Sequence, residues 1–144
     1  MSTEQVRETM QSYAEALLAR GDYGRFFAEE IRFEVVGTGQ QAQGAESVEQ
    51  AIRFLHEVAF DARPEIANVL VDDNAAAAEA TFVGRHIGEF AGIGATGRAV
   101  RVPYAVFYEL DAGTITALRL YMPMDQLLAQ IGTAADAEAA RSTV

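Results

Sequence analysis

Hydrophobic residues recur every three to four positions in two stretches of the first half of the chain, which is the spacing of amphipathic helices. Ser2 and Gln5 have the spacing of a capping box, so the first helix is expected to begin there. Its predicted buried stripe consists of Val6, Met10, Tyr13, Ala14, Leu17 and Leu18. Gly21 is expected to end this helix, and Asp22 to begin a short second one. A third helix is predicted over residues 46–60.

Alternating hydrophobic and polar positions predict strands in the rest of the chain. The expected strands cover residues 30–37, 65–71, 75–87, 98–110 and 114–122. Turns or loops are predicted in the polar or glycine-rich segments 37–44, 72–74, 88–97 and 111–113. A short helix over residues 125–131 and a frayed, alanine-rich tail over residues 133–144 follow. Because helices come first and a meandering antiparallel sheet follows, the predicted class is α+β, with one domain over residues 1–132.

Composition narrows the range of functions. The chain has 144 residues, 21 acidic and 11 basic, and a formal charge of −10 at pH 7. A negative chain repels phosphate groups, so neither nucleic acid nor a membrane surface is an expected partner. All basic residues are arginine and cysteine is absent, which excludes lysine Schiff bases, thiolate catalysis and disulfides. The sequence contains neither a secretory signal pattern nor an apolar membrane span, so the expected location is the cytoplasm.

Two further sequence features favour ordinary structural roles. Residues 92–97 spell G-x-G-x-x-G, but a strand pattern follows them where a dinucleotide site needs a helix, so a plain loop and no cofactor are expected. The two histidines, His56 and His86, show no metal-ligand spacing, and no metal is expected. Each is interpreted as a surface or core-edge residue. The alternative for His86 is a dyad with nearby Glu89 at the mouth of a pocket.

The order of the elements and three local motifs resemble a known family. The motifs are Gln43-Gly-Ala-Glu-Ser-Val-Glu-Gln50, Gly88-Glu-Phe-Ala-Gly-Ile-Gly-Ala-Thr-Gly-Arg98, and Gly113-Thr-Ile-Thr-Ala-Leu-Arg-Leu-Tyr121 with Leu127-Leu-Ala-Gln-Ile-Gly132. Over residues 3–132 the chain resembles the SnoaL-like polyketide cyclases, which are related to limonene-1,2-epoxide hydrolase and ketosteroid isomerase. The resemblance implies the nuclear-transport-factor-2-like fold. In that fold a cone-shaped, curved antiparallel sheet packs against three N-terminal helices, and a short C-terminal helix follows.

The catalytic residues of this family are not preserved in the sequence. The epoxide hydrolases use an arginine and an aspartate on the long middle strand and an aspartate on the last strand, and the matching positions here are Thr81, Val83 and Leu120. The cyclases place an acid at the position of Leu120 and a histidine near that of Val106. Because a leucine can neither transfer a proton nor orient water, the resemblance supplies neither mechanism.

Alternation along the strands predicts which side chains face a pocket, because residues two apart share a face. If Leu120 faces inward, the same face carries apolar side chains with a few polar ones. The predicted set is Tyr13, Glu34, Val36, Thr81, Val83, Arg85, Val102, Tyr104, Val106, Tyr108, Leu118, Leu120 and Met122. A cleft of this composition is typical of a small-molecule site.

Glu34 is the predicted acid–base residue, because it interrupts an apolar run and would be desolvated there. Tyr104 and Tyr108 could stabilise a developing enolate, as a tyrosine and a protonated acid do in ketosteroid isomerase. Arg85 could bind a substrate carboxylate or keep Glu34 ionised. The alternative is that Glu34 forms a plain salt bridge with Arg85 or Arg32, and that the tyrosines only pack.

These observations favour a cofactor-independent cyclase or isomerase that acts on a hydrophobic, polyketide- or terpenoid-like molecule. A non-catalytic ligand-binding protein is the second hypothesis, because the family acids are missing, and epoxide hydrolysis is the third. A homodimer through the sheet is also expected, since small residues on an outer face permit another sheet to approach. The residues expected on that face are Ala76, Ala78, Ala80, Phe82, Ala117, Arg119 and Tyr121.

Overall fold

The computed structural model describes residues 1–132, so the predicted tail over residues 133–144 lies outside the described residues. In chain order the elements are α1 (Thr3–Leu18), the 3₁₀ turn η1 (Tyr23–Phe26), β1 (Phe27–Val35), β2 (Gln40–Gln43), α2 (Ala45–Arg53), the π-helical turn η2 (Phe54–Val58), β3 (Phe60–Val71), β4 (Ala75–His86), β5 (Ala99–Asp111), β6 (Thr114–Tyr121) and α3 (Met124–Ile131). The α+β class is therefore confirmed.

The predicted capping box begins α1. The Gln5 amide donates to Ser2 Oγ (3.2 Å), and the Ser2 amide donates to Gln5 Oε1 (2.8 Å). These two bonds satisfy backbone donors that the first turn of a helix leaves free. The buried face of the helix carries Val6, Met10 and Tyr13 and packs against β3 and β4.

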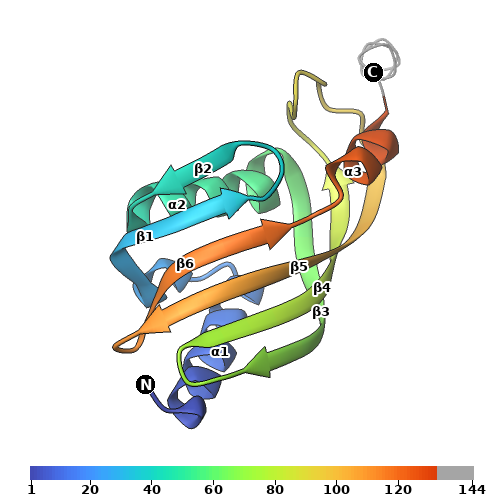
Figure 1. Cartoon of the computed structure of the whole chain (residues 1–144). Coiled ribbons are helices and arrows are strands. Elements are labelled where there is room, and N and C mark those ends of the chain that lie inside the picture. The colour runs from blue at the N-terminus through green and yellow to red at the C-terminus, as the bar shows by residue number, and fades with distance from the viewer. Residues whose placement is uncertain (133–144) are drawn as a thin grey trace.

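The six strands form one curved sheet with the order β2-β1-β6-β5-β4-β3. Figure 1 shows the sheet bending around α1, with α2 lying across its β1–β2 end. The short α3 contacts β5. The core fills the concave side of the sheet, where its residues meet the buried faces of α1 and α2.

Two features differ from the predicted antiparallel meander. β1 pairs with β6 in parallel, so the sheet is mixed. The predicted loop 37–44 contains the short strand β2, which pairs antiparallel with β1 at one edge. Alternation can reveal a strand but not its partner, and a polar edge strand needs only backbone pairing.

β3 begins at Phe60, five residues before the predicted start at residue 65. The helical segment before it ends at Val58, whereas the helix was predicted to end at residue 60. Pro64 lies inside this strand, and a proline normally argues against a strand interior. Because β3 is the other edge of the sheet, its outer side needs no backbone donor. The pairing of Pro64 with Phe82 of β4 is therefore compatible with the proline ring.

Gly84 lies where β4 passes close to β3, and this contact gives a stability prediction. A Cβ atom at Gly84 would lie 2.3 Å from the Asp61 carbonyl oxygen and 2.5 Å from Ala62 Cα. Because both are backbone atoms, the strands would have to separate. We expect Gly84→Ala to lower the free energy of unfolding by about 1–3 kcal/mol in urea denaturation. The control is Gly21→Ala, whose Cβ would meet only the Ala16 oxygen at 3.7 Å; equal losses in the two variants would contradict the prediction.

Candidate functional site

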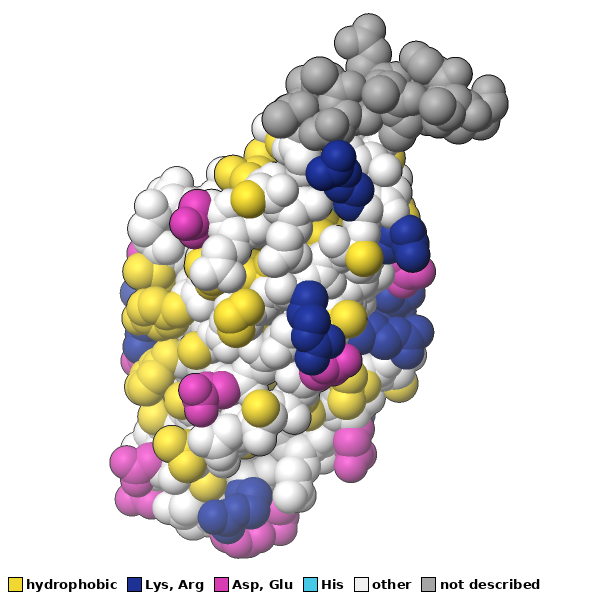
Figure 2. Space-filling model, turned by 90° about the vertical axis from the view of Figure 1, so that its right-hand side faces the viewer, with side chains coloured by type: hydrophobic (Ala, Val, Ile, Leu, Met, Phe, Trp, Pro, Cys, Tyr) yellow, Lys and Arg dark blue, Asp and Glu magenta, His cyan; other side chains and the backbone are white. Residues whose placement is uncertain are grey.

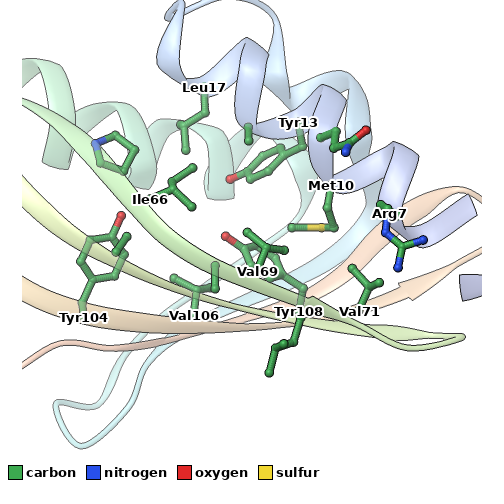
Figure 3. A pocket seen from close by; sticks show the side chains of 16 residues that line it. Arg7, Met10, Tyr13, Leu17, Ile66, Val69, Val71, Tyr104, Val106 and Tyr108 are labelled. Atoms are coloured by element: carbon green, nitrogen blue, oxygen red, sulfur yellow. The ribbon is translucent and has the colours of Figure 1, made fainter. Parts of the chain in front are cut away.

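A cavity of about 470 Å³ lies between α1 and the concave face of the sheet. Its walls come from α1, β3, β4 and β5, and most of the lining side chains are apolar (Figure 3). Arg7 is the one charged residue among them. The volume lies within the range of about 300–1,000 Å³ that is usual for small-molecule sites.

Three tyrosines line this cavity, in addition to Arg7 and Gln11. Figure 3 shows Tyr13 on α1 and Tyr104 and Tyr108 on β5, with their hydroxyls pointing into the space between the helix and the sheet. The rings of Tyr13 and Tyr108 meet edge to face, with their centroids 6.0 Å apart. Burial, reinforced at Tyr13 and Tyr108 by neighbouring tyrosines, raises the pKa of each phenol well above its ordinary value. All three therefore stay neutral and keep a proton to donate.

The predicted inward face of β5 and β6 is confirmed. Val102, Val106, Leu118, Leu120 and Met122 are all buried in the core. Val106 lines the large cavity, and the β6 residues line a smaller chamber of about 50 Å³ beneath it. The two spaces share Val106, Leu17 and the three tyrosines, so they adjoin at these side chains.

On β4 the prediction was wrong, because this strand presents the opposite face to the cavity. The inward residues are Ala76, Ala78, Ala80 and Phe82, all of which are buried. The pairing places Ala80 opposite Tyr104, and directly paired residues share a face. The outward residues are Thr81, Val83 and Arg85. The Arg85 guanidinium donates to the carbonyl of Gly97.

Glu34 also faces away from the apolar cavity, contrary to the prediction. Phe33 and Val35 pair with the inward residues Leu118 and Leu120 of β6, whereas Glu34 lines a separate hollow of about 380 Å³. The lining of this hollow includes Arg32 and Arg119 but none of the three tyrosines. The register neighbours of Glu34 there are Arg119 on β6 and Gln41 on β2. Val36 lies just beyond the end of β1, where its amide donates to the Leu120 oxygen (2.9 Å). Glu34 therefore does not meet the tyrosines.

His86 has a structural role, and the alternative of a dyad with Glu89 is not formed. The side chain is fully buried and packs on Phe60, with ring centroids 5.3 Å apart. The Thr96 amide donates to His86 Nδ1 (3.2 Å), and the Thr96 hydroxyl lies 3.0 Å from the same nitrogen. His86 thus anchors the 88–97 loop, and Glu89 is exposed.

His56 is the residue that sequence reasoning missed. It belongs to η2 and lines the smaller chamber, with its ring 5.4 Å from that of Phe82. Its Nδ1 lies 2.8 Å from the Ile52 carbonyl oxygen, whereas its Nε2 is buried without a hydrogen-bond partner. Burial lowers the pKa of His56, so the ring is neutral near pH 7. The signal was its position four residues after the apolar Ile52 in the predicted third helix, because side chains four apart share one face of a helix.

The described residues contain no group of three or more histidine, cysteine, aspartate or glutamate side chains that could hold a metal ion. Within residues 1–132, no helix has both the length and the apolar character needed to span a membrane. Figure 2 shows one face of the molecule, on which acidic and basic side chains are dispersed in small groups between hydrophobic and polar ones. The net negative charge therefore forms no single patch on that face.

Solved structures with the same fold come from several bacteria. A candidate SnoaL-like polyketide cyclase from Jannaschia sp. CCS1 is 20% identical with a TM-score of 0.80, and the match covers 91% of this chain and 94% of the other. A candidate polyketide cyclase from Xanthomonas campestris pv. campestris is 19% identical (TM-score 0.79; 90% and 98% covered). A candidate ketosteroid isomerase from Kribbella flavida is 22% identical (TM-score 0.64; 84% and 79% covered).

At these identities the likeness of the structures shows the fold alone. No curated protein sequence matches the chain. The sequence model of the SnoaL-like polyketide cyclases, however, matches residues 7–131. This match spans nearly all of the described residues, and the protein therefore belongs to the SnoaL-like polyketide cyclase family.

Proposed function

We propose that this protein is a cofactor-independent enzyme that cyclises or isomerises a hydrophobic, polyketide- or terpenoid-like carbonyl compound. The observation that carries the proposal is the set of three neutral tyrosine hydroxyls that point into one apolar cavity. A buried neutral hydroxyl donates a hydrogen bond most effectively to an oxygen that gains negative charge during the reaction. The tyrosine side chains can therefore stabilise an enolate without first being displaced from other partners.

The chemistry follows from this arrangement. When a proton leaves the carbon next to a carbonyl group, the electron pair of the C–H bond forms a C=C bond, and the carbonyl π pair moves onto oxygen. A tyrosine hydroxyl donates to that oxyanion. Returning the proton to a different carbon completes an isomerisation, and attack of the enolate carbon on a second carbonyl carbon closes a ring. The raised pKa values of Tyr104 and Tyr108 ensure that the hydroxyls remain donors.

A non-catalytic ligand-binding protein would use the same cavity. The absence of carboxylates from the lining of both the cavity and the chamber favours it, since most of the family's chemistry uses an acid. Epoxide hydrolysis is disfavoured by the same observation: Thr81 and Val83 face outward, and Leu120 is apolar. The catalytic and binding hypotheses differ in whether a bound ketone exchanges its α-protons.

The test uses 2-tetralone, a bicyclic ketone whose α-protons exchange with D₂O and can be followed by NMR. We expect the protein to accelerate this exchange and Tyr108→Phe to slow it about tenfold to a hundredfold, because the variant loses a hydrogen bond to a charged oxygen, worth about 1.5–3 kcal/mol. The control is Tyr121→Phe, since Tyr121 is 47% exposed on the other face of the sheet. Exchange no faster than in buffer would contradict the catalytic hypothesis and favour the ligand-binding hypothesis.

We also propose that two copies associate through the outer face of β5 and β6. Phe107 and Tyr121 are exposed there, and the Arg119 guanidinium stacks on Phe107 at 4.8 Å while pairing with Glu109. The alanines and Phe82 of β4 do not belong to this face, because they point into the cavity. A second copy would remove the exposed rings from water.

For this association we expect sedimentation velocity to show a dimer at micromolar concentration. Phe107→Asp should shift it toward monomer, because a carboxylate would have to be desolvated between the two sheets. Leu18→Asp, at an exposed position on α1, is the control and should leave the sedimentation coefficient unchanged. A wild-type monomer at that concentration would rule out the proposed interface.

A further inference from the structure

The hydrogen bond at Nδ1 determines which nitrogen of His56 can accept a proton. A backbone carbonyl oxygen only accepts hydrogen bonds, so the short contact with Ile52 requires the proton of the neutral ring to sit on Nδ1. The other nitrogen, Nε2, then carries a lone pair. This lone pair is buried and has no partner among the described residues, and such an unpaired buried acceptor costs free energy that a bound ligand could recover.

His56 lines the same chamber as the three tyrosines. His56 lines the smaller chamber, and Tyr13, Tyr104 and Tyr108 line both this chamber and the large cavity. A ketone that reaches the chamber from the cavity would thus meet hydroxyl donors for its oxygen and, beside them, the imidazole. Among the residues that line the two spaces, His56 is the one side chain that can accept a proton near pH 7, since Arg7 is already protonated.

We propose that His56 is the proton acceptor of the reaction, a role that rests on the proposed function. Nε2 takes the proton from the carbon next to the substrate carbonyl. The C–H electron pair becomes the C=C bond of the enolate, and the carbonyl π pair moves to the oxygen that accepts a hydrogen bond from a tyrosine. The imidazolium then returns the proton to carbon in an isomerisation, or to the new alkoxide in a ring closure.

The backbone around His56 is held in an unusual conformation. The Ala59 amide donates to the Phe54 oxygen at 2.8 Å, five residues back, which is the bond of a π-helical turn. Such turns often occur at functional sites. Arg20 secures this turn from outside: one guanidinium nitrogen donates to the His56 carbonyl (3.3 Å) and the Ala62 carbonyl (3.1 Å), and pairs with Asp61 (2.7 Å).

The charges near His56 favour a neutral ring in the resting protein. Desolvation by burial lowers its pKa most, and the positive charge of Arg20 lowers it further. The hydrogen bond to Ile52 and the nearby Glu57 act in the opposite direction. The remaining titratable groups of the chamber are the three neutral tyrosines. A neutral ring is the form that a proton acceptor needs before the reaction.

The first experiment measures α-proton exchange of 2-tetralone in variants of the two histidines. We expect His56→Gln to lower the rate at least about a hundredfold, the usual contribution of a general base, whereas His86→Gln should keep the rate per folded molecule. If His56→Gln keeps the wild-type rate while Tyr108→Phe slows exchange, the proposal for His56 is wrong but the proposed catalytic function is retained. If the wild-type protein does not accelerate exchange, the proposed catalytic function itself is wrong.

Two measurements on the wild-type protein test the proposal even if the His56 variant does not fold. In ¹⁵N NMR spectra we expect opposite tautomers: Nδ1–H for His56, and Nε2–H for His86, whose Nδ1 accepts the Thr96 amide. The exchange rate should stay constant down to about pH 6.5, the ordinary pKa of histidine, and fall only below it. An Nε2–H tautomer at His56, or a rate that falls already above that pH, would overturn the proposal.

Discussion

The pairing of β4 with β5 determines the shape of the interior. It places Ala76 opposite Tyr108 and Ala80 opposite Tyr104, so that a large side chain on one strand faces a small one on its neighbour. Two rows of large side chains at these positions would fill the space beneath α1. Because alanine carries no side chain beyond Cβ, the tyrosine rings keep a free volume beside them, and the cavity follows from the register of two strands.

Desolvation then determines which groups can act in this volume. Burying an unpaired carboxylate in such an apolar lining costs a large desolvation free energy. The residues around both spaces include no carboxylate. Tyrosine and histidine avoid this penalty because each is neutral near pH 7. The proposed site thus combines tyrosine donors and a histidine acceptor that carry no charge at rest. Charge would appear only during proton transfer, when donors and acceptor are already in place.

The sequence predicted features that local chemistry controls. The capping box at Ser2, the 72–74 and 111–113 turns, the 88–97 loop and the inward positions of β5 and β6 all follow from nearby residues. The parallel partner of β1 did not, because pairing between distant strands leaves no local signal. The inward face of β4 was misassigned for a different reason: the four alanines at 75–78 give alternation no contrast. The polar signal lies further along, at Glu79 and Arg85, which share the outward face with Thr81 and Val83. Glu34 was placed inward by strand alternation and lines a different hollow, whereas His56, interpreted as a surface or core-edge residue, lines the smaller chamber.

Pro64 also affects how the edge of the sheet can interact with other molecules in a crowded solution. An open sheet ends in strands whose free amides and carbonyls could template a strand from another molecule. β3 is such an end, and it carries exposed apolar side chains at Val69 and Leu70. Since proline has no amide proton, a ladder added along β3 would be interrupted at this residue. Pro64 thus hinders the growth of an added strand along the edge that forms one wall of the cavity.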